Sequence, residues 1–127
     1  MKCYCDSGLM YVVCCAPFHG GVAAPTPEAL MRSRYSAYVL NLNDYLQLTW
    51  HPSTRPEDVS VEVGLKWLGL SVKKAWIASE NEGFVEFIAR YKVGGARAER
   101  LHEVSRFVRE CVAGEYRWFY VDGTFPV

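Results

Sequence analysis

The chain has 127 residues, of which 50% are hydrophobic, which is enough for one domain with a buried core. Its 14 Lys and Arg residues balance its 14 Asp and Glu residues, which argues against nucleic acid as a partner, although a local basic patch is compatible with this balance. No apolar run approaches the roughly 20 residues that span a bilayer, and the N-terminus lacks the apolar segment of a signal peptide. We therefore expect a cytoplasmic protein without membrane insertion, in which thiols stay reduced.

Four of the five cysteines lie close to the N-terminus, in two pairs: Cys3, Cys5, Cys14 and Cys15. The turn at Ser7-Gly8 lets the chain reverse and bring the pairs together. Four thiolates at one point are typical of a structural Zn²⁺ site, so residues 1–19 are predicted to form a zinc knuckle. His19 is the substitute ligand if adjacent Cys14 and Cys15 cannot both reach one ion. Free or oxidised thiols are the alternative, and Cys111 is the spare cysteine.

Two helices are predicted between residues 26 and 52. Thr26 can act as an N-cap, and Pro27 suits the first helical position. Apolar residues then recur at helical spacing: Met31, Tyr35, Tyr38, Val39 and Leu42. Asn43 is expected to cap a second helix that Pro52 ends. Residues 53–66 are ambiguous, with room for one short helix from Pro56.

The second half of the chain has the composition of β-strands. Segments rich in Val, Phe, Trp, Tyr and Ile are separated by short turns: 67–79, 84–93, 100–110 and 116–122. Short connections imply antiparallel pairing. We therefore expect an α+β domain over residues 20–127, with helices packed on one face of a curved four-stranded sheet. The aromatic run at 116–120 is expected to form an inner strand with both faces covered.

The cysteine segment resembles a known motif, and the resemblance extends along the chain. Cys3-x-Cys5-x-Ser7-Gly8-x-x-Tyr11-x-x-Cys14-Cys15 is similar to the SEC-C motif, a small zinc knuckle. The segment 24–38, Ala-Pro-Thr-Pro-Glu-Ala-Leu-Met-Arg-Ser-Arg-Tyr-Ser-Ala-Tyr, resembles the one that follows this knuckle in the bacterial YchJ family. Residues 50–54, 67–70 and 101–107 resemble later blocks of that family.

This resemblance implies a SEC-C knuckle followed by a nuclear-transport-factor-2-like cone, without an established activity. It also implies that the ligands of the knuckle are Cys3, Cys5, Cys14 and Cys15. One departure is Asp6, which stands where the motif usually has Gly. Asp tolerates a positive φ better than most residues, so the turn is expected to survive.

A second candidate site is polar and would lie in a pocket between the sheet and the helices. Glu86, Glu103, His51 and His102 are weak candidates for acid–base catalysis, and Arg34 is a weak candidate for binding a ligand there. The alternative is that these residues are cross-strand partners on a solvated face. The choice depends on which face of each strand is buried, and the sequence leaves this open.

These observations predict a zinc-binding protein that serves as a protein-interaction or small-ligand-binding module. A protein partner would dock on the knuckle at Leu9, Met10, Tyr11 and Val12. The first alternative is a pocket enzyme of the isomerase, dehydratase or hydrolase type that uses Glu and His as acid and base. The second is a redox-switched module, in which cysteine oxidation ejects zinc. The oligomeric state is not predicted.

Overall fold

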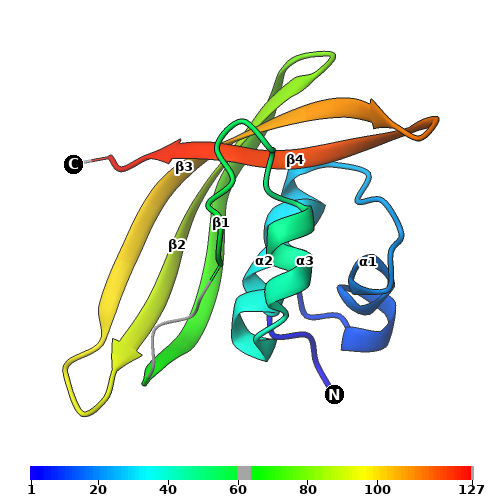
Figure 1. Cartoon of the computed structure of the whole chain (residues 1–127). Helices are drawn as coiled ribbons and strands as arrows, with labels where there is room; N and C mark the ends of the chain where they lie inside the picture. The colour runs from blue at the N-terminus through cyan, green and yellow to red at the C-terminus, as the bar shows by residue number, and fades with distance from the viewer. Residues whose placement is uncertain (60–63, 127) are drawn as a thin grey trace.

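The computed structural model describes residues 1–59 and 64–126 (Figure 1). Its strands form one antiparallel sheet in the order β1-β2-β3-β4. Their bounds are Leu65–Ser79 for β1, Glu82–Val93 for β2, Glu99–Val112 for β3 and Glu115–Thr124 for β4. The predicted α+β architecture with a four-stranded antiparallel sheet is confirmed, and the strands extend slightly beyond the predicted limits.

The helices also follow the predicted order. α2 spans Pro27–Leu40, and Thr26 caps it by accepting a hydrogen bond from the backbone N–H of Ala29 at 3.1 Å. Asn41 ends α2 in the left-handed conformation, with φ 59°. α3 spans Asn43–Leu48, so Asn43 is its first residue rather than its cap. Within residues 53–59, which are described, no helix forms at Pro56.

Two short helical turns in the knuckle were not predicted. A 3₁₀ turn, η1, spans Tyr11–Val13, and α1 spans Ala16–His19. Each is too short to show hydrophobic periodicity. They bracket the adjacent cysteines at positions 14 and 15, and their role becomes clear only from the geometry of the cysteine cluster.

α2 is the central helix, because it packs between the sheet and the N-terminal segment (Figure 1). Its Met31 and Tyr35 belong to the same buried hydrophobic core as Phe87 on β2. On another side of α2, Ser33 and Ser36 are fully buried, and Ser36 contacts the knuckle. Small side chains here allow the knuckle to approach the helix closely, which explains why α2 is buried on more than one side.

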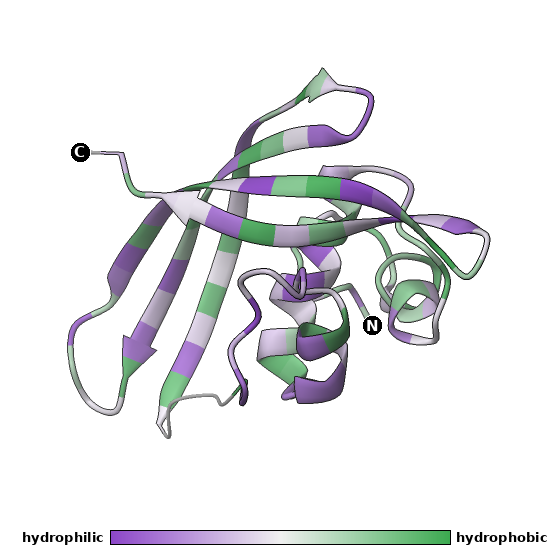
Figure 2. Ribbon diagram, turned by 45° about the horizontal axis from the view of Figure 1, so that its top comes forward, coloured by the Kyte–Doolittle hydropathy of each residue, from purple (hydrophilic) through white to green (hydrophobic). Residues whose placement is uncertain are grey.

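The sheet has an inner face toward α2 and an outer face toward solvent. On β2, the buried residues Val85, Phe87 and Ala89 alternate with more exposed ones. On β3, Glu103, Ser105 and Phe107 are the buried set. The alternation of hydrophobic and hydrophilic residues is visible along the strands in Figure 2.

The expectation that the aromatic run at 116–120 forms an inner strand is wrong, because β4 is an edge of the sheet. The edge is nevertheless covered in part. The backbone N–H of His51 donates to the carbonyl of Tyr120 at 2.7 Å, and the N–H of Tyr120 donates to the carbonyl of Thr49 at 2.9 Å. These bonds form a short parallel bridge after α3, which satisfies backbone groups that an open edge would expose.

Candidate functional site

The four N-terminal cysteines converge on one point. The Sγ atoms of Cys3, Cys5, Cys14 and Cys15 all lie within 4.8 Å of one another. The Cys5 and Cys14 sulfurs are 3.6 Å apart, and those of Cys14 and Cys15 are 3.9 Å apart. Tetrahedral coordination with Zn–S bonds of about 2.3 Å would place sulfurs about 3.8 Å apart. The cluster therefore has the dimensions of a four-thiolate metal site.

The two adjacent cysteines reach the same point because the backbone changes direction between them. Cys14 follows η1 with φ −112° and ψ −92°, and Cys15 precedes α1 with φ −86° and ψ −23°. The break between the two turns sends successive side chains to one side. His19 is therefore not needed as a substitute. Its Nε2 lies 2.8 Å from the carbonyl of Ser33, and its Nδ1 lies 2.7 Å from the hydroxyl of Tyr11.

Hydroxyl groups surround the sulfurs. Ser36 on α2 lies 3.4 Å from the sulfur of Cys15 and 3.5 Å from that of Cys3, and Ser7 lies 3.1 Å from that of Cys14. A hydrogen bond from Cys15 holds the pKa of Cys5 below its usual value, and the same bond, with burial, raises the pKa of Cys15. Such donors stabilise thiolate charge, which is the usual surrounding of a metal-bound thiolate.

Asp6 adopts the positive φ expected of it, at 60°, and adds a contact that Gly could not make. Its Oδ2 accepts a hydrogen bond from the backbone N–H of Leu70 at 2.9 Å. Leu70 follows an irregularity in β1 between Trp67 and Gly69. A second tie joins the knuckle to α2, since Nη1 of Arg32 donates to the carbonyl of Cys5 at 2.8 Å. The knuckle is therefore fixed to both the sheet and the helix.

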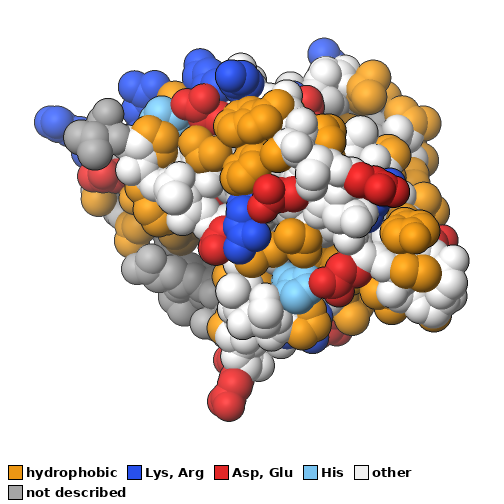
Figure 3. Space-filling model, turned by 90° about the horizontal axis from the view of Figure 1, so that it is seen from above, with side chains coloured by type: hydrophobic (Ala, Val, Ile, Leu, Met, Phe, Trp, Pro, Cys, Tyr) orange, Lys and Arg blue, Asp and Glu red, His pale blue; other side chains and the backbone are white. Residues whose placement is uncertain are grey.

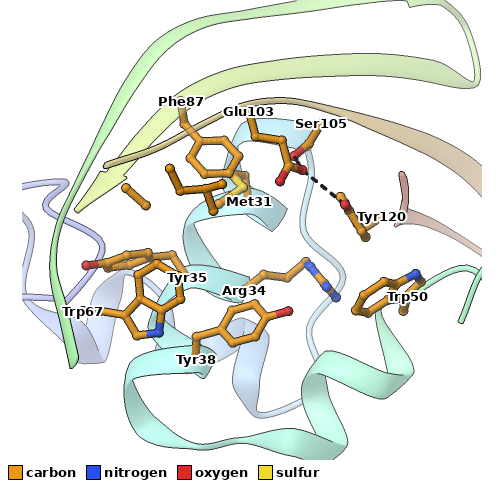
Figure 4. Close-up of a pocket in the computed structure, with 12 residues that line it drawn as sticks. Met31, Arg34, Tyr35, Tyr38, Trp50, Trp67, Phe87, Glu103, Ser105 and Tyr120 are labelled. Carbon is orange, nitrogen blue, oxygen red and sulfur yellow. Dashed lines mark hydrogen bonds between the residues drawn. The ribbon is translucent and has the colours of Figure 1, made fainter. Parts of the chain in front are cut away.

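A second candidate site is a cavity of about 220 Å³ between α2 and the inner face of the sheet (Figure 4). Its walls are mostly aromatic and aliphatic, with a few polar groups. The lining residues are Met31, Arg34, Tyr35, Tyr38, Trp50, Trp67, Phe87, Ala89, Leu101, Glu103, Ser105 and Tyr120. An apolar cavity with a few convergent polar groups is the usual form of a small-molecule site.

Arg34 extends from α2 into this cavity and is only 4% exposed. Its Nη1 donates to the carbonyl of Leu46 at 3.0 Å and to Oγ1 of Thr49 at 2.6 Å. The guanidinium carbon lies 5.2 Å from the centre of the Trp50 ring and 4.8 Å from that of Tyr120. Burial lowers the pKa of the guanidinium. Ring faces and a carbonyl dipole therefore compensate its charge directly.

Glu103 places a buried carboxylate on the opposite wall (Figure 4). Its Oε2 accepts hydrogen bonds from Ser105 Oγ at 2.6 Å and from the Tyr120 hydroxyl at 3.1 Å. Burial and the charge of Glu103 raise the pKa of Tyr120, which keeps the phenol a donor. Gly123 on β4 leaves the space that this carboxylate fills, because a Cβ there would overlap its oxygen. Within the described residues, Glu103 and Arg34 make no ion pair with each other.

Trp67 contributes a group that the sequence did not single out. Its indole Nε1–H is buried and has no hydrogen-bond partner among the described residues. Its ring lies in the pocket wall, 5.7 Å from Tyr35 and 5.9 Å from Tyr38 between ring centres. A buried donor without an acceptor costs free energy, so this N–H is a candidate for contact with a ligand.

The other candidate residues lie outside the cavity. Glu86 and His102 form a pair on the outer face of the sheet, with 2.7 Å between Oε2 and Nε2. His51 pairs with Glu110 at 2.7 Å. Cys111 is exposed and free. The structure therefore brings Arg34 and Glu103 to one pocket and places the candidates Glu86, His51 and His102 outside it. Acid–base chemistry in this pocket would rest on Glu103.

Comparisons with known proteins agree with this arrangement. Residues 26–123 match the family model described as the YchJ middle domain, which is NTF2-like. The chain is 56% identical to a UPF0225 protein of Cupriavidus metallidurans over 124 residues, which cover 95% of this chain and 86% of that protein. A UPF0225 protein of Chromobacterium violaceum is 52% identical over 128 residues, covering 95% and 90%.

Two solved structures are similar over nearly the whole chain. The solution structure of a SEC-C motif containing protein from Rhodopseudomonas palustris is 36% identical, with a TM-score of 0.84 and complete coverage of both chains. The crystal structure of a SEC-C motif containing protein from Psychrobacter arcticus is 28% identical, with a TM-score of 0.81, covering 98% of this chain and 82% of that one. Among the described residues, no helix combines the length and hydropathy that crossing a membrane requires.

The family model, the relatives and the solved structures together show that the chain belongs to the YchJ family, with a SEC-C cysteine cluster attached to an NTF2-like domain.

Proposed function

We propose that this protein holds a structural Zn²⁺ in its knuckle and binds a small ligand in the cone pocket. Zinc fits a closed set of four thiolates, since soft sulfur ligands in a tetrahedron favour it over Mg²⁺ or Ca²⁺. The ion would be held by Cys3, Cys5, Cys14 and Cys15. Four cysteine ligands leave no position for a substrate on the metal, so the metal would stabilise the knuckle. A small-molecule ligand would bind in the pocket instead.

The observation that carries the ligand proposal is the buried Nε1–H of Trp67, which has no partner among the described residues. Arg34 and Glu103 add opposite charges on the walls, so the pocket as a whole favours a neutral guest. The aromatic walls favour a planar body. A small planar ligand with an acceptor for Trp67 and a donor for Glu103 would satisfy these groups, and an aromatic amide is the simplest probe of that kind.

We expect benzamide to bind in the millimolar range and to shift the indole N–H resonance of Trp67 in a ¹H–¹⁵N NMR titration. Benzoate and benzylammonium are matched probes with a negative and a positive charge, and both should bind more weakly because the pocket already holds one charge of each sign. Substituting Trp67→Phe identifies the resonance. The variant Glu103→Gln should weaken benzamide binding, while Glu86→Gln on the outer face should not. Equal binding of all three probes, or none, would contradict the proposal.

A second candidate function is docking of a protein partner on the knuckle. Leu9, Met10, Val12 and Val13 are exposed, by 45% to 69%. Tyr11, which the sequence grouped with them, is partly buried and hydrogen-bonded to His19, so Val13 takes its place in this surface. The double variant Met10→Ser/Val12→Ser should abolish capture of a partner in cross-linking experiments while zinc content is unchanged. Unchanged capture would exclude this surface.

A further inference from the structure

The outer face of the sheet carries a concentration of positive charge that the neutral composition conceals. Basic residues lie on β1, β2 and β3 and on the hairpin between β2 and β3: Lys66, Lys73, Lys74, Arg90, Lys92, Arg97 and Arg100. Among the described residues, none of these makes an ion pair, whereas Arg106 and Arg109 farther along β3 do. In Figure 3, Lys and Arg side chains gather along one edge of the molecule. The seven basic residues listed above are called the basic face.

Like charges lie directly opposite each other on this face. Arg90 on β2 pairs in register with Arg100 on β3, and Lys66 on β1 pairs with Lys92 on β2. Directly opposed like charges destabilise a sheet. Nearby acids are few: Glu86 lies opposite Lys74 in the β1–β2 register and is bound to His102, and Glu99 is exposed at the start of β3. The Arg90–Arg100 and Lys66–Lys92 pairs themselves place like charges opposite each other, which lowers stability, as expected of a surface that meets an anion.

The basic face also contains a groove of about 510 Å³. Lys73, Arg90 and Arg100 line it, together with Ser71. Gly69 lies opposite Arg90 in the β1–β2 register and leaves backbone exposed as part of the wall. Asp6 is the acid at this groove, and its carboxylate is engaged by the backbone N–H of Leu70. A groove lined by cations and a hydroxyl can follow a narrow anionic chain more closely than a flat surface.

Two aromatic rings, of which Trp76 is exposed and Phe84 partly buried, continue the face beyond the groove. Trp76 on β1 and Phe84 on β2 are stacked, with 5.2 Å between ring centres and an interplanar angle of 16°. The ammonium of Lys74 lies 5.0 Å from the centre of the Trp76 ring. Trp76 is 36% exposed, which is unusual for a side chain of this size. Cations and accessible aromatic rings are the two elements with which proteins hold single strands, through phosphate contacts and base stacking.

We propose that the basic face binds single-stranded nucleic acid, with phosphates in the groove at Arg90 and Arg100 and bases against Trp76 and Phe84. A single strand is favoured over a duplex because duplex bases cannot stack on side chains. It is favoured over a membrane because a groove on a strongly bent sheet offers an anionic bilayer little area. The balance of charge over the whole chain predicts modest affinity with a steep dependence on salt.

The test uses the full-length protein and a labelled oligouridylate of about 12 nucleotides, within the range that single-strand sites cover. Fluorescence anisotropy between about 50 and 200 mM NaCl gives the affinity and its salt slope. Substituting Arg90→Gln/Arg100→Gln should weaken binding at least about tenfold at the lower salt. It should also reduce the slope of log K against log salt by about 1.4, because each phosphate contact on a single strand contributes about 0.7.

The matched control is Arg109→Gln/Arg117→Gln, which removes the same charge from the other end of the sheet, where acidic partners are present. It should leave affinity and slope little changed. The Arg90→Gln/Arg100→Gln variant should be no less heat-stable than the parent, since it relieves a like-charge pair. The proposal fails if the oligonucleotide does not bind at low salt or if both double variants lose affinity equally. It also fails if vesicles of phosphatidylglycerol bind and the oligonucleotide does not.

Discussion

Substituting Cys5→Ala should release the metal and unfold the knuckle while the sheet stays folded. Cys5 is fully buried in the cluster. Three thiolates cannot close a tetrahedral site, and structural zinc sites supply folding free energy to segments with too little apolar surface. Zinc measured by native mass spectrometry should fall from one ion per chain to none. Amide hydrogen exchange should become fast at Cys3, whose N–H donates to the carbonyl of Leu9 at 2.8 Å, but stay slow in β2 and β3.

The control is Cys111→Ala, because Cys111 is exposed, free and distant in sequence from the cluster. It should change neither zinc content nor exchange. A Cys5→Ala protein that still retained one zinc per chain would show that Cys5 is not a ligand. A parent protein purified without zinc, and unable to take it up, would refute the structural role itself.

Substituting Arg34→Ala should lower the free energy of unfolding by about 3 kcal/mol or more. The change leaves a cavity between the rings of Trp50 and Tyr120 and removes the donor to Leu46 and Thr49. It also removes the positive charge that interacts with the buried carboxylate of Glu103 across the pocket. Urea unfolding followed by far-UV circular dichroism measures the effect.

Arg34→Met separates volume from charge in this position. Methionine fills much of the space and removes the cost of burying a cation, so the loss of stability should be smaller than for Arg34→Ala, within about 1 to 2 kcal/mol. Both variants should lose benzamide binding if Arg34 balances the charge of Glu103 in the pocket. A loss below about 1 kcal/mol for Arg34→Ala would mean that the guanidinium contributes little to the packing of α2 and α3.

The cysteine cluster and the sheet were predictable because each rests on local spacing. Two cysteine pairs on either side of a Gly turn suffice to suggest convergence, and strands separated by short turns suffice to suggest a meander. The positive φ at Asp6 was predicted from the resemblance instead, because Asp6 stands where the SEC-C motif usually has Gly.

The pocket was only partly predictable, because it depends on which face of each strand is buried. Glu86 and Glu103 lie on neighbouring strands in similar surroundings of Val, Phe and Arg, yet Glu86 points outward and Glu103 inward. The buried state of Glu103 depends on Ser105, Tyr120 and the space at Gly123, which come together only in the fold. The opposition of Arg90 and Arg100 likewise depends on the β2–β3 register, which composition cannot reveal.

Asp6 connects the cysteine cluster to the groove on the basic face. It directly follows Cys5, and its carboxylate holds the backbone of β1 at Leu70, which forms part of the groove on the basic face. Without the proposed zinc, the knuckle would release this restraint, and the groove wall would become free to shift. Thermodynamic linkage then requires the converse: an oligonucleotide that prefers the restrained groove strengthens zinc binding by the same free energy with which zinc strengthens binding of the oligonucleotide. Competition for zinc with a chelator, measured with and without oligouridylate, would give the coupling free energy between the two sites.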